Sequence, residues 1–167
     1  MSGPDFDPIR LLGLLNRHNV RYVVIGGFAA VAYGSPLPTS DVDITPARDP
    51  ANLERLSTAL SDLDARVRVD GIPGGLAFSH SKESLGDVRV LNLVTRLGEL
   101  DLVMSPAGGA GFEELAGRQL VVRLHEVDVP LAALDDVIAA KEAAGRPKDR
   151  NSLPLLRELR DRLAREA

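Results

Sequence analysis

The sequence predicts an α/β fold, in which strand patterns and helix patterns alternate along most of the chain. Apolar residues recur at three- and four-residue spacing in several segments, which is the period of a helix that buries one face. Shorter segments rich in β-branched residues lie between them, as expected for strands. The helical pattern covers residues 8–18, 50–63, 131–144 and the C-terminal end, and the strand pattern covers 22–25, 39–44, 66–69, 88–95 and 99–104.

Two aspartate–proline pairs, Asp7-Pro8 and Asp49-Pro50, predict where the first two long helices begin. Aspartate accepts a hydrogen bond from a free N–H of the first turn, and proline is tolerated there because that turn needs no donor. The first of these helices is expected to end near His18. The apolar residues on the inward faces are interpreted as core: Ile9, Leu12 and Leu15 in the first helix, and Leu53, Leu56, Leu60 and Leu63 in the second.

The middle of the chain predicts short strands separated by turns. Alternation of polar and apolar residues over 66–69 indicates a strand, and the glycines and proline of 70–75 indicate a turn that leads into a short strand at 76–78. Two longer strands follow at 88–95 and 99–104, and we expect a hairpin to join them near Gly98.

The C-terminal third predicts a loop, a small paired region and two helices. A Gly/Pro-rich loop at 105–111 leads into a short helix, and short strands at 119–124 and 127–129 are close enough to pair. A strong helix over 131–144 ends at Gly145, a residue typical of helix C-termini. A last helix is expected after Asn151-Ser152, with Leu156, Leu159 and Leu163 turned inward.

Composition excludes several kinds of site. Cysteine is absent, which rules out disulfides, thiol nucleophiles and cysteine zinc sites. The three histidines lie far apart without the spacing of metal ligands, so we expect them on the surface or in loops. No apolar run approaches the ~18 residues of a membrane span, and residues 1–10 do not resemble a signal peptide. We therefore expect a cytoplasmic protein that does not bind membranes.

The net charge of −4 is unevenly distributed. Residues 141–167 hold eight Lys or Arg against five Asp or Glu, so the rest of the chain is acidic. Tight nonspecific binding of nucleic acid relies on neutralising many phosphates, which an acidic body does not favour. The modest basic end is still suited to contact a phosphate-bearing substrate.

The stretch from residue 22 to residue 44 is the most informative part of the sequence. Gly26-Gly27 follows a buried strand, and the N–H groups of a short helix over 28–33 would face the gap that the glycines leave, which makes an anion site. On the next strand, Asp41 and Asp43 share one face because strand side chains alternate. The combination predicts a divalent metal together with a phosphate. Taken singly, a Gly-Gly turn and an Asp-x-Asp strand face are usually structural.

This stretch resembles the signature of the polymerase-beta-like nucleotidyltransferase superfamily: a hydrophobic strand, Gly-Gly, about a dozen residues, and Asp-x-Asp. Within the superfamily, GGFAAVAYGSPLPTSDVDI is most similar to the small bacterial nucleotidyltransferases related to AbiEii-type toxins. The segment from Ile138 to Asp149 also resembles the helix and turn that close these proteins. The resemblance implies one nucleotidyltransferase domain over residues 1–167. A mixed sheet flanked by helices would form residues 1–130, and a C-terminal helical pair would form 131–167.

The resemblance also implies roles for individual residues. Asp101 occupies the place of the third catalytic carboxylate of the family. An acid within so apolar a strand is costly to bury unless it is paired or binds metal. The alternative is that Asp101 is an acid on an edge strand and faces solvent. Asp41, Asp43 and Asp101 would hold Mg²⁺ or Mn²⁺, with Lys141 as a catalytic cation. The nucleoside triphosphate would be bound by Gly26, Gly27, Ser35, Thr39, Lys148 and Asp149.

The function implied by the resemblance is metal-dependent transfer of a nucleoside monophosphate from a nucleoside triphosphate to an acceptor hydroxyl. The acceptor would be a tRNA 3′ end, a protein or a small molecule, and the partner a tRNA or a cognate protein of a toxin–antitoxin pair. The alternative is a non-catalytic binding module with a degenerate site. The alternative is favoured by the acidic body and by residues 34–38, which lack the basic residue that relatives often carry there.

Overall fold

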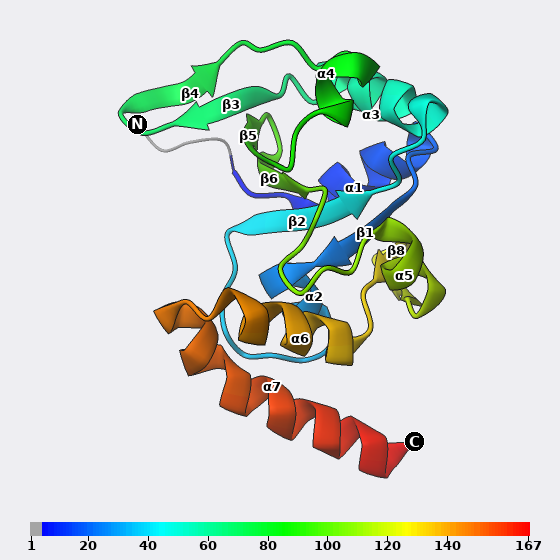
Figure 1. Ribbon diagram of the computed structural model, residues 1–167, viewed down its shortest axis with the longest axis vertical. Helices are drawn as coiled ribbons and strands as arrows, with labels where there is room; N and C mark the ends of the chain where they lie inside the picture. The colour runs from blue at the N-terminus through cyan, green and yellow to red at the C-terminus, as the bar shows by residue number, and fades with distance from the viewer. Residues whose placement is uncertain (1–4) are drawn as a thin grey trace.

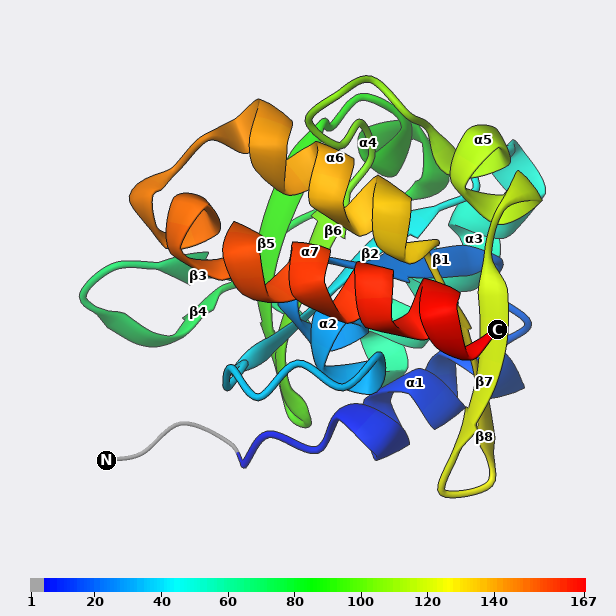
Figure 2. The same cartoon turned by 90° about the horizontal axis from the view of Figure 1, so that it is seen from below.

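The structure is a computed structural model that describes residues 5–167. One eight-stranded mixed sheet forms the centre, with α6 and α7 on one side and α3 and α4 on the other (Figures 1 and 2). The strands are β1 (Tyr22–Ile25), β2 (Asp41–Pro46), β3 (Arg66–Val69), β4 (Ile72–Leu76), β5 (Val90–Thr95), β6 (Gly98–Val103), β7 (Leu120–Leu124) and β8 (Val127–Leu131). The helices are α1 (Pro8–Arg17), α2 (Gly26–Ala32), α3 (Pro50–Asp62), α4 (Lys82–Gly86), α5 (Phe112–Gly117), α6 (Leu134–Ala144) and α7 (Pro147–Glu166).

The strand order across the sheet is β4-β3-β5-β6-β2-β1-β8-β7. Strand β2 pairs antiparallel with β1 and parallel with β6, so the sheet is mixed, as the resemblance implied. The β5–β6 hairpin expected near Gly98 is present, and β7 pairs with β8. Because β2 and β6 are neighbours in register, residues that are far apart in sequence lie side by side at the centre of the sheet.

Both aspartate–proline pairs start helices, which confirms the sequence prediction. The Asp7 side chain accepts a hydrogen bond from the N–H of Arg10 at 3.2 Å, and Asp49 accepts one from the N–H of Asn52 at 3.1 Å. The predicted core residues of the two helices are buried, with Ile9 only half-buried: Leu12, Leu15, Leu53, Leu56, Leu60 and Leu63. Among residues 5–167, no helix has the length and apolar character that crossing a membrane requires.

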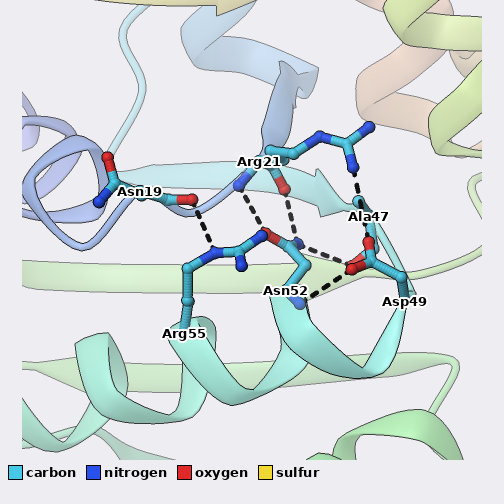
Figure 3. Close-up of polar contacts among 6 residues, drawn as sticks. All are labelled: Asn19, Arg21, Ala47, Asp49, Asn52 and Arg55. Atoms are coloured by element: carbon cyan, nitrogen blue, oxygen red, sulfur yellow. Dashed lines mark hydrogen bonds and ion pairs between the residues drawn. The ribbon is translucent and has the colours of Figure 1, made fainter.

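The fully buried Asn52 joins α3 to the sheet (Figure 3). Its Oδ1 accepts a hydrogen bond from the N–H of Arg21 at 2.8 Å, and its Nδ2 donates to the carbonyl of Arg21 at 3.0 Å. The same Nδ2 donates to the carbonyl of Ala47 at 2.8 Å. One amide thus satisfies backbone groups just before β1 and just after β2, and so fixes the helix against the two strands that lead into the centre of the sheet.

Replacement of Asn52 by Ala should therefore destabilise the protein by about 2–3 kcal/mol, because it leaves buried backbone groups without partners. Urea unfolding of the variant and the parent would measure the loss. Asn151→Ala, at an exposed position of α7, is the matched control and should change the free energy of unfolding by no more than about 0.5 kcal/mol. Equal stability of the Asn52 variant and the parent would contradict the structural role of this amide.

The turn predicted at 70–75 is present only at residues 70 and 71, because Ile72–Leu76 forms strand β4. The pairing of β3 with β4 changes register between Val67 and Val69, and Gly74 and Gly75 have positive φ angles of 79° and 71°. A Cβ at Gly75 would collide with the carbonyl of Val67, so the glycines let an irregular edge strand approach its neighbour. The strand expected at 76–78 is absent, and the short helix α4 was not predicted from the sequence.

Three helix starts also differ from the prediction. Helix α2 begins at Gly26, so the two glycines belong to the helix. Helix α6 begins at Leu134, and α7 begins at Pro147 with a capping box between Arg146 and Asp149. The predicted C-terminal helical pair is present, with Gly145 at a φ of 62° between its members. Leu156 and Leu159 are buried as expected, whereas Leu163 is 36% exposed and does not belong to the core.

Candidate active site

Three aspartates from two neighbouring strands meet at the centre of the sheet. Asp41 and Asp43 alternate along β2, and the parallel register pairs Asp43 with Asp101 on β6. Each of the three carboxylates offers an oxygen atom within 4.8 Å of the oxygens offered by the other two. The alternation of β2 and the register of two non-consecutive strands together produce the cluster.

The cluster is electrostatically unfavourable without a counter-charge. Burial raises the pKa of the Asp43 carboxyl above its ordinary value, and the negative charge of Asp41 raises it further. Burial is also the largest cause of the raised pKa of Asp101, and the neighbouring carboxylates add to it. One carboxylate oxygen of Asp43 and one of Asp101 are buried without a hydrogen-bond partner among residues 5–167. Buried carboxylate oxygens that accept no hydrogen bond are suited to serve as ligands for a cation.

The start of helix α2 packs directly against this cluster. Gly26 has a positive φ of 69°, and a Cβ at this position would collide with the Asp43 carboxylate. A Cβ at Gly27 would lie 3.2 Å from Oγ1 of Thr39, whose hydroxyl donates to the backbone carbonyl of Asp41 at 3.2 Å. Both glycines therefore let the backbone of α2 approach the carboxylates more closely than any other residue would.

Replacement of Gly26 by Ala should both destabilise the fold and displace the Asp43 carboxylate. The positive φ alone costs an alanine about 1–2 kcal/mol, and the collision with Asp43 adds to this cost. Chemical denaturation gives the stability change. Gly117→Ala is the control, because nothing lies within 4 Å of a Cβ there. An alanine at position 26 that leaves stability unchanged would show that this close approach is not required.

A cavity of about 650 Å³ opens in front of the aspartates. Its walls include the three aspartates and the residues around Gly26 and Thr39 on one side, and residues of α6 and the start of α7 on the other. The sequence-predicted residues that line it are Gly26, Gly27, Ser35, Thr39, Asp41, Asp43, Asp101, Lys141 and Lys148. Lining residues that were not predicted from the sequence include Ser40, Asn92 and Arg146.

Asp149 is the predicted site residue that does not line this cavity. Its carboxylate is fully buried and accepts hydrogen bonds from Nε of Arg146 at 2.7 Å and from the Arg146 backbone N–H at 3.2 Å. Nζ of Lys141 lies 3.6 Å from its other oxygen. The sequence signal that could have revealed this arrangement is the spacing of Arg146 and Asp149, which is that of a helix-capping pair around Pro147.

The two lysines therefore differ in their surroundings. Lys141 is 17% exposed and forms an ion pair with Asp149. Lys148 is exposed, and within the described part of the chain it forms no ion pair, although it lies close enough to Asp43 to lower the pKa of that carboxyl in part. Arg146, Lys148 and Lys141 together give the cavity a cationic wall that faces the three carboxylates.

Comparison with protein-family models gives no match, and comparison with curated proteins gives no significant match. Solved structures do match. LnuA, a lincosamide antibiotic adenylyltransferase bound to lincomycin, is 15% identical with a TM-score of 0.59 over 90% of this chain and 94% of its own. ANT(2'')-Ia in complex with adenylyl-2''-tobramycin is 16% identical with a TM-score of 0.54 over 94% and 95%. A candidate nucleotidyltransferase from Thermotoga maritima is 15% identical with a TM-score of 0.55 over 87% and 86%. The chain therefore has the nucleotidyltransferase fold.

Proposed function

We propose that this protein is a metal-dependent nucleotidyltransferase, which moves a nucleoside monophosphate from a nucleoside triphosphate to an acceptor hydroxyl. The observation that carries the proposal is the meeting of Asp41, Asp43 and Asp101 at the wall of a cavity whose opposite wall is cationic. Carboxylates suit divalent metals, and cations suit phosphates. The fold shared with LnuA and ANT(2'')-Ia supports the same reaction class.

The residues present fit a hard divalent cation. All three ligand candidates are carboxylates, and Asp43 and Asp101 each have a buried oxygen without a hydrogen-bond partner in the described chain. Asp41, Asp43 and Asp101 would thus hold Mg²⁺ or Mn²⁺. Bound there, the metal would neutralise phosphate charge and lower the pKa of the acceptor hydroxyl.

Addition of Mg²⁺ or Mn²⁺ should raise the melting temperature of the parent protein, because a cation that binds only the folded state stabilises it. The triple variant Asp41→Asn, Asp43→Asn, Asp101→Asn should show no such rise, since it lacks the charges that bind the cation. Thermal denaturation at increasing metal concentration measures both. An equal rise in the two proteins would place any metal binding elsewhere.

The chain's own groups would position the triphosphate. The backbone N–H groups of Gly26 and Gly27 would receive the β- and γ-phosphates, and the hydroxyls of Ser35 and Thr39 would add contacts. Lys148 or Lys141 would stabilise the negative charge that develops during transfer. Phosphoryl transfer depends mainly on positioning and electrostatics, which these groups provide without a nucleophilic side chain.

The acceptor hydroxyl in this proposal belongs to a small molecule, a tRNA 3′ end or a protein. The small molecule is favoured by LnuA, which is solved with lincomycin, and by ANT(2'')-Ia, which is solved with adenylylated tobramycin. Because the sequence resembles AbiEii-related nucleotidyltransferases, we also propose that the protein is part of a toxin–antitoxin pair. The alternative of a non-catalytic module is favoured by the cavity-lining residues Ser35, Leu37 and Pro38, none of which carries a charge.

The proposal is tested by incubating the protein with each labelled nucleoside triphosphate, Mg²⁺ and, separately, cellular RNA, protein and small metabolites. We expect label to move to one class of acceptor, and chelation of the metal to stop the transfer. The Asp43→Asn variant is the control for contaminating activity. Transfer by the variant at the rate of the parent would overturn the proposal, and binding of nucleotide without transfer to any acceptor would favour the non-catalytic module.

A further inference from the structure

The strand order determines from which side an acceptor would reach the aspartates, and this inference rests on the proposed function. The glycines that would receive the leaving phosphates lie at the end of β1, and the order then runs β1, β2, β6, β5 and β3. In phosphoryl transfer the attacking and leaving oxygens lie roughly in line on opposite sides of the phosphorus. The acceptor would therefore approach from the β5 and β3 side of Asp101.

The sheet face on that side carries a small and partly open surface. Asn92 on β5 lies opposite Asp101, and Val90 lies opposite Val103, so these side chains share the face of the aspartate. Asn92, Val90 and Val103 all line the cavity, and Val90 is 53% exposed. Beyond β5, the β3–β4 hairpin extends outward past the start of α7 (Figure 2).

Arg68 on β3 is a cation next to this surface: it contacts Asp101, which lines the cavity, but does not itself line it. Its Nη1 donates a hydrogen bond to Oε2 of Glu99 at 2.7 Å. Its Nη2 lies 3.5 Å from Oδ1 of Asp101, an oxygen that has no hydrogen-bond partner among residues 5–167. The Arg68 side chain is 32% exposed. Glu99 therefore anchors one nitrogen, while the other lies next to Asp101 without a hydrogen bond of its own.

A guanidinium held in this way is suited to bind an anion. Its planar donors match the paired oxygens of a carboxylate or phosphate, and the anchor on Glu99 reduces the freedom that binding would otherwise remove. The surface has few groups that could bind a cationic acceptor. Among the described residues that line the cavity, the carboxylates are those of the three aspartates, and the nearby Glu99 is already paired with Arg68.

We propose that the acceptor is a hydroxylated small molecule with a phosphate or carboxylate group, and that Arg68 binds this group beside Asp101. The reactive hydroxyl would then lie at Asp101, on the side away from the glycines. An acceptor rich in ammonium groups, such as tobramycin, would be repelled by Arg68. Beyond the three aspartates, no carboxylate among the described residues that line the cavity could pair with it.

The first test measures anion binding directly and does not require turnover. Inorganic phosphate and acetate are added separately to the isotope-labelled protein, and the side-chain Nε resonance of Arg68 is followed by NMR, with Arg68→Met providing the assignment. We expect a saturable shift with at least one of the two anions. A response to phosphate alone indicates a phosphate group, and a response to acetate alone indicates a carboxylate.

Two variants control this experiment. Arg123→Met removes another strand arginine that is paired with a carboxylate, Asp128, and should leave the response of Arg68 unchanged. Lys148→Met removes a cation from the nucleotide side and should also leave it unchanged. Absence of a saturable shift at Arg68 with both anions would overturn the proposal, as would a shift that disappears in Lys148→Met, because the anion would then be bound on the nucleotide side.

The second test measures turnover. Cellular metabolites are separated by anion exchange into retained and unretained fractions, and each fraction is supplied with labelled nucleoside triphosphate and Mg²⁺. We expect labelled product from the retained fraction. Arg68→Met should raise the KM of the acceptor in this fraction about tenfold or more, with little change in the KM of the triphosphate. Arg68→Lys keeps the positive charge but loses the paired donors of the guanidinium. Its KM for the acceptor should therefore lie between the values of the parent and of Arg68→Met.

The outcomes separate this inference from the proposed function. Labelled product from the unretained fraction, from tobramycin or from RNA would overturn the anionic small-molecule acceptor while supporting nucleotidyl transfer. Absence of product from every acceptor would count against the proposed function. In that case the NMR response of Arg68 still decides whether this surface binds an anion. If Arg68 only offsets the charge of Asp101, its resonance would show no saturable response to either anion, and its replacement would lower stability without changing the KM of the acceptor.

Discussion

Replacement of Asp43 by Asn should abolish nucleotidyl transfer and leave the protein folded. Asp43 is the central member of the cluster, since it lies opposite Asp101 and alternates with Asp41 on the same strand. The amide keeps the shape of the side chain and removes the charge that would hold the metal. We expect transfer to fall by about a thousandfold or more, a loss of the size seen when groups that stabilise transition-state charge are removed. A rate assay with labelled triphosphate measures this loss.

In the parent, the contribution of Asp43 to stability should depend on pH in the opposite sense to that of a salt-bridged acid. The pKa of the Asp43 carboxyl is raised in the folded protein, chiefly by burial, so ionisation of this group opposes folding. The parent should lose stability as pH rises from the unfolded pKa, about 4, through the raised folded pKa. Without metal, Asp43→Asn should therefore be more stable than the parent at about pH 8 and gain little at about pH 3.

Leu56→Ala is the matched structural control for Asp43→Asn. Leu56 is fully buried, and its truncation should cost about 2–5 kcal/mol through the cavity it leaves. Its activity per folded molecule should stay near that of the parent. If Asp43→Asn destabilises the protein as much as Leu56→Ala does, the aspartate has a structural role and the site assignment is wrong.

Replacement of Lys148 by Met should weaken binding of the nucleoside triphosphate by about tenfold or more, which corresponds to about 1.4 kcal/mol. Lys148 lies exposed at the cavity wall, so its charge would be free to contact phosphate, and its loss should change stability little. Equilibrium binding of a labelled triphosphate in the presence of Mg²⁺ measures the affinity. Arg150→Met is the control, because this exposed residue is on the same helix but does not line the cavity.

The companion variant Lys141→Met separates a catalytic role of Lys141 from a structural one. The ion pair with the buried Asp149 gives Lys141 a partner, so we expect a loss of stability and a smaller loss of affinity than in Lys148→Met. A tenfold loss of affinity for the triphosphate in Lys141→Met, with unchanged affinity in Lys148→Met, would assign the phosphate contact to Lys141 and not to Lys148. Unchanged affinity in both variants would contradict the nucleotide site itself.

Local sequence patterns were sufficient for the starts of α1 and α3, for the buried faces of these two helices and for part of the site. Asp7 and Asp49 cap helices because a cap depends only on residues within one turn. The leucines of α3 are buried because helical periodicity sets which face is apolar. Asp41 and Asp43 share a face for an equally local reason, the alternation of a strand. Residues 72–75 differ from the prediction because glycines that are typical of turns also permit an irregular edge strand.

The remainder of the site depends on contacts between segments that are distant in sequence. The parallel register of β2 with β6 brings Asp101 to Asp43, and neither strand specifies that register by itself. Tertiary structure likewise decided that Asp149 is buried against Arg146 and Lys141, whereas its neighbour Lys148 faces the cavity. Periodicity and propensity describe one segment at a time. Which strands become neighbours, and hence which charges meet, is decided only when those segments pack around one core.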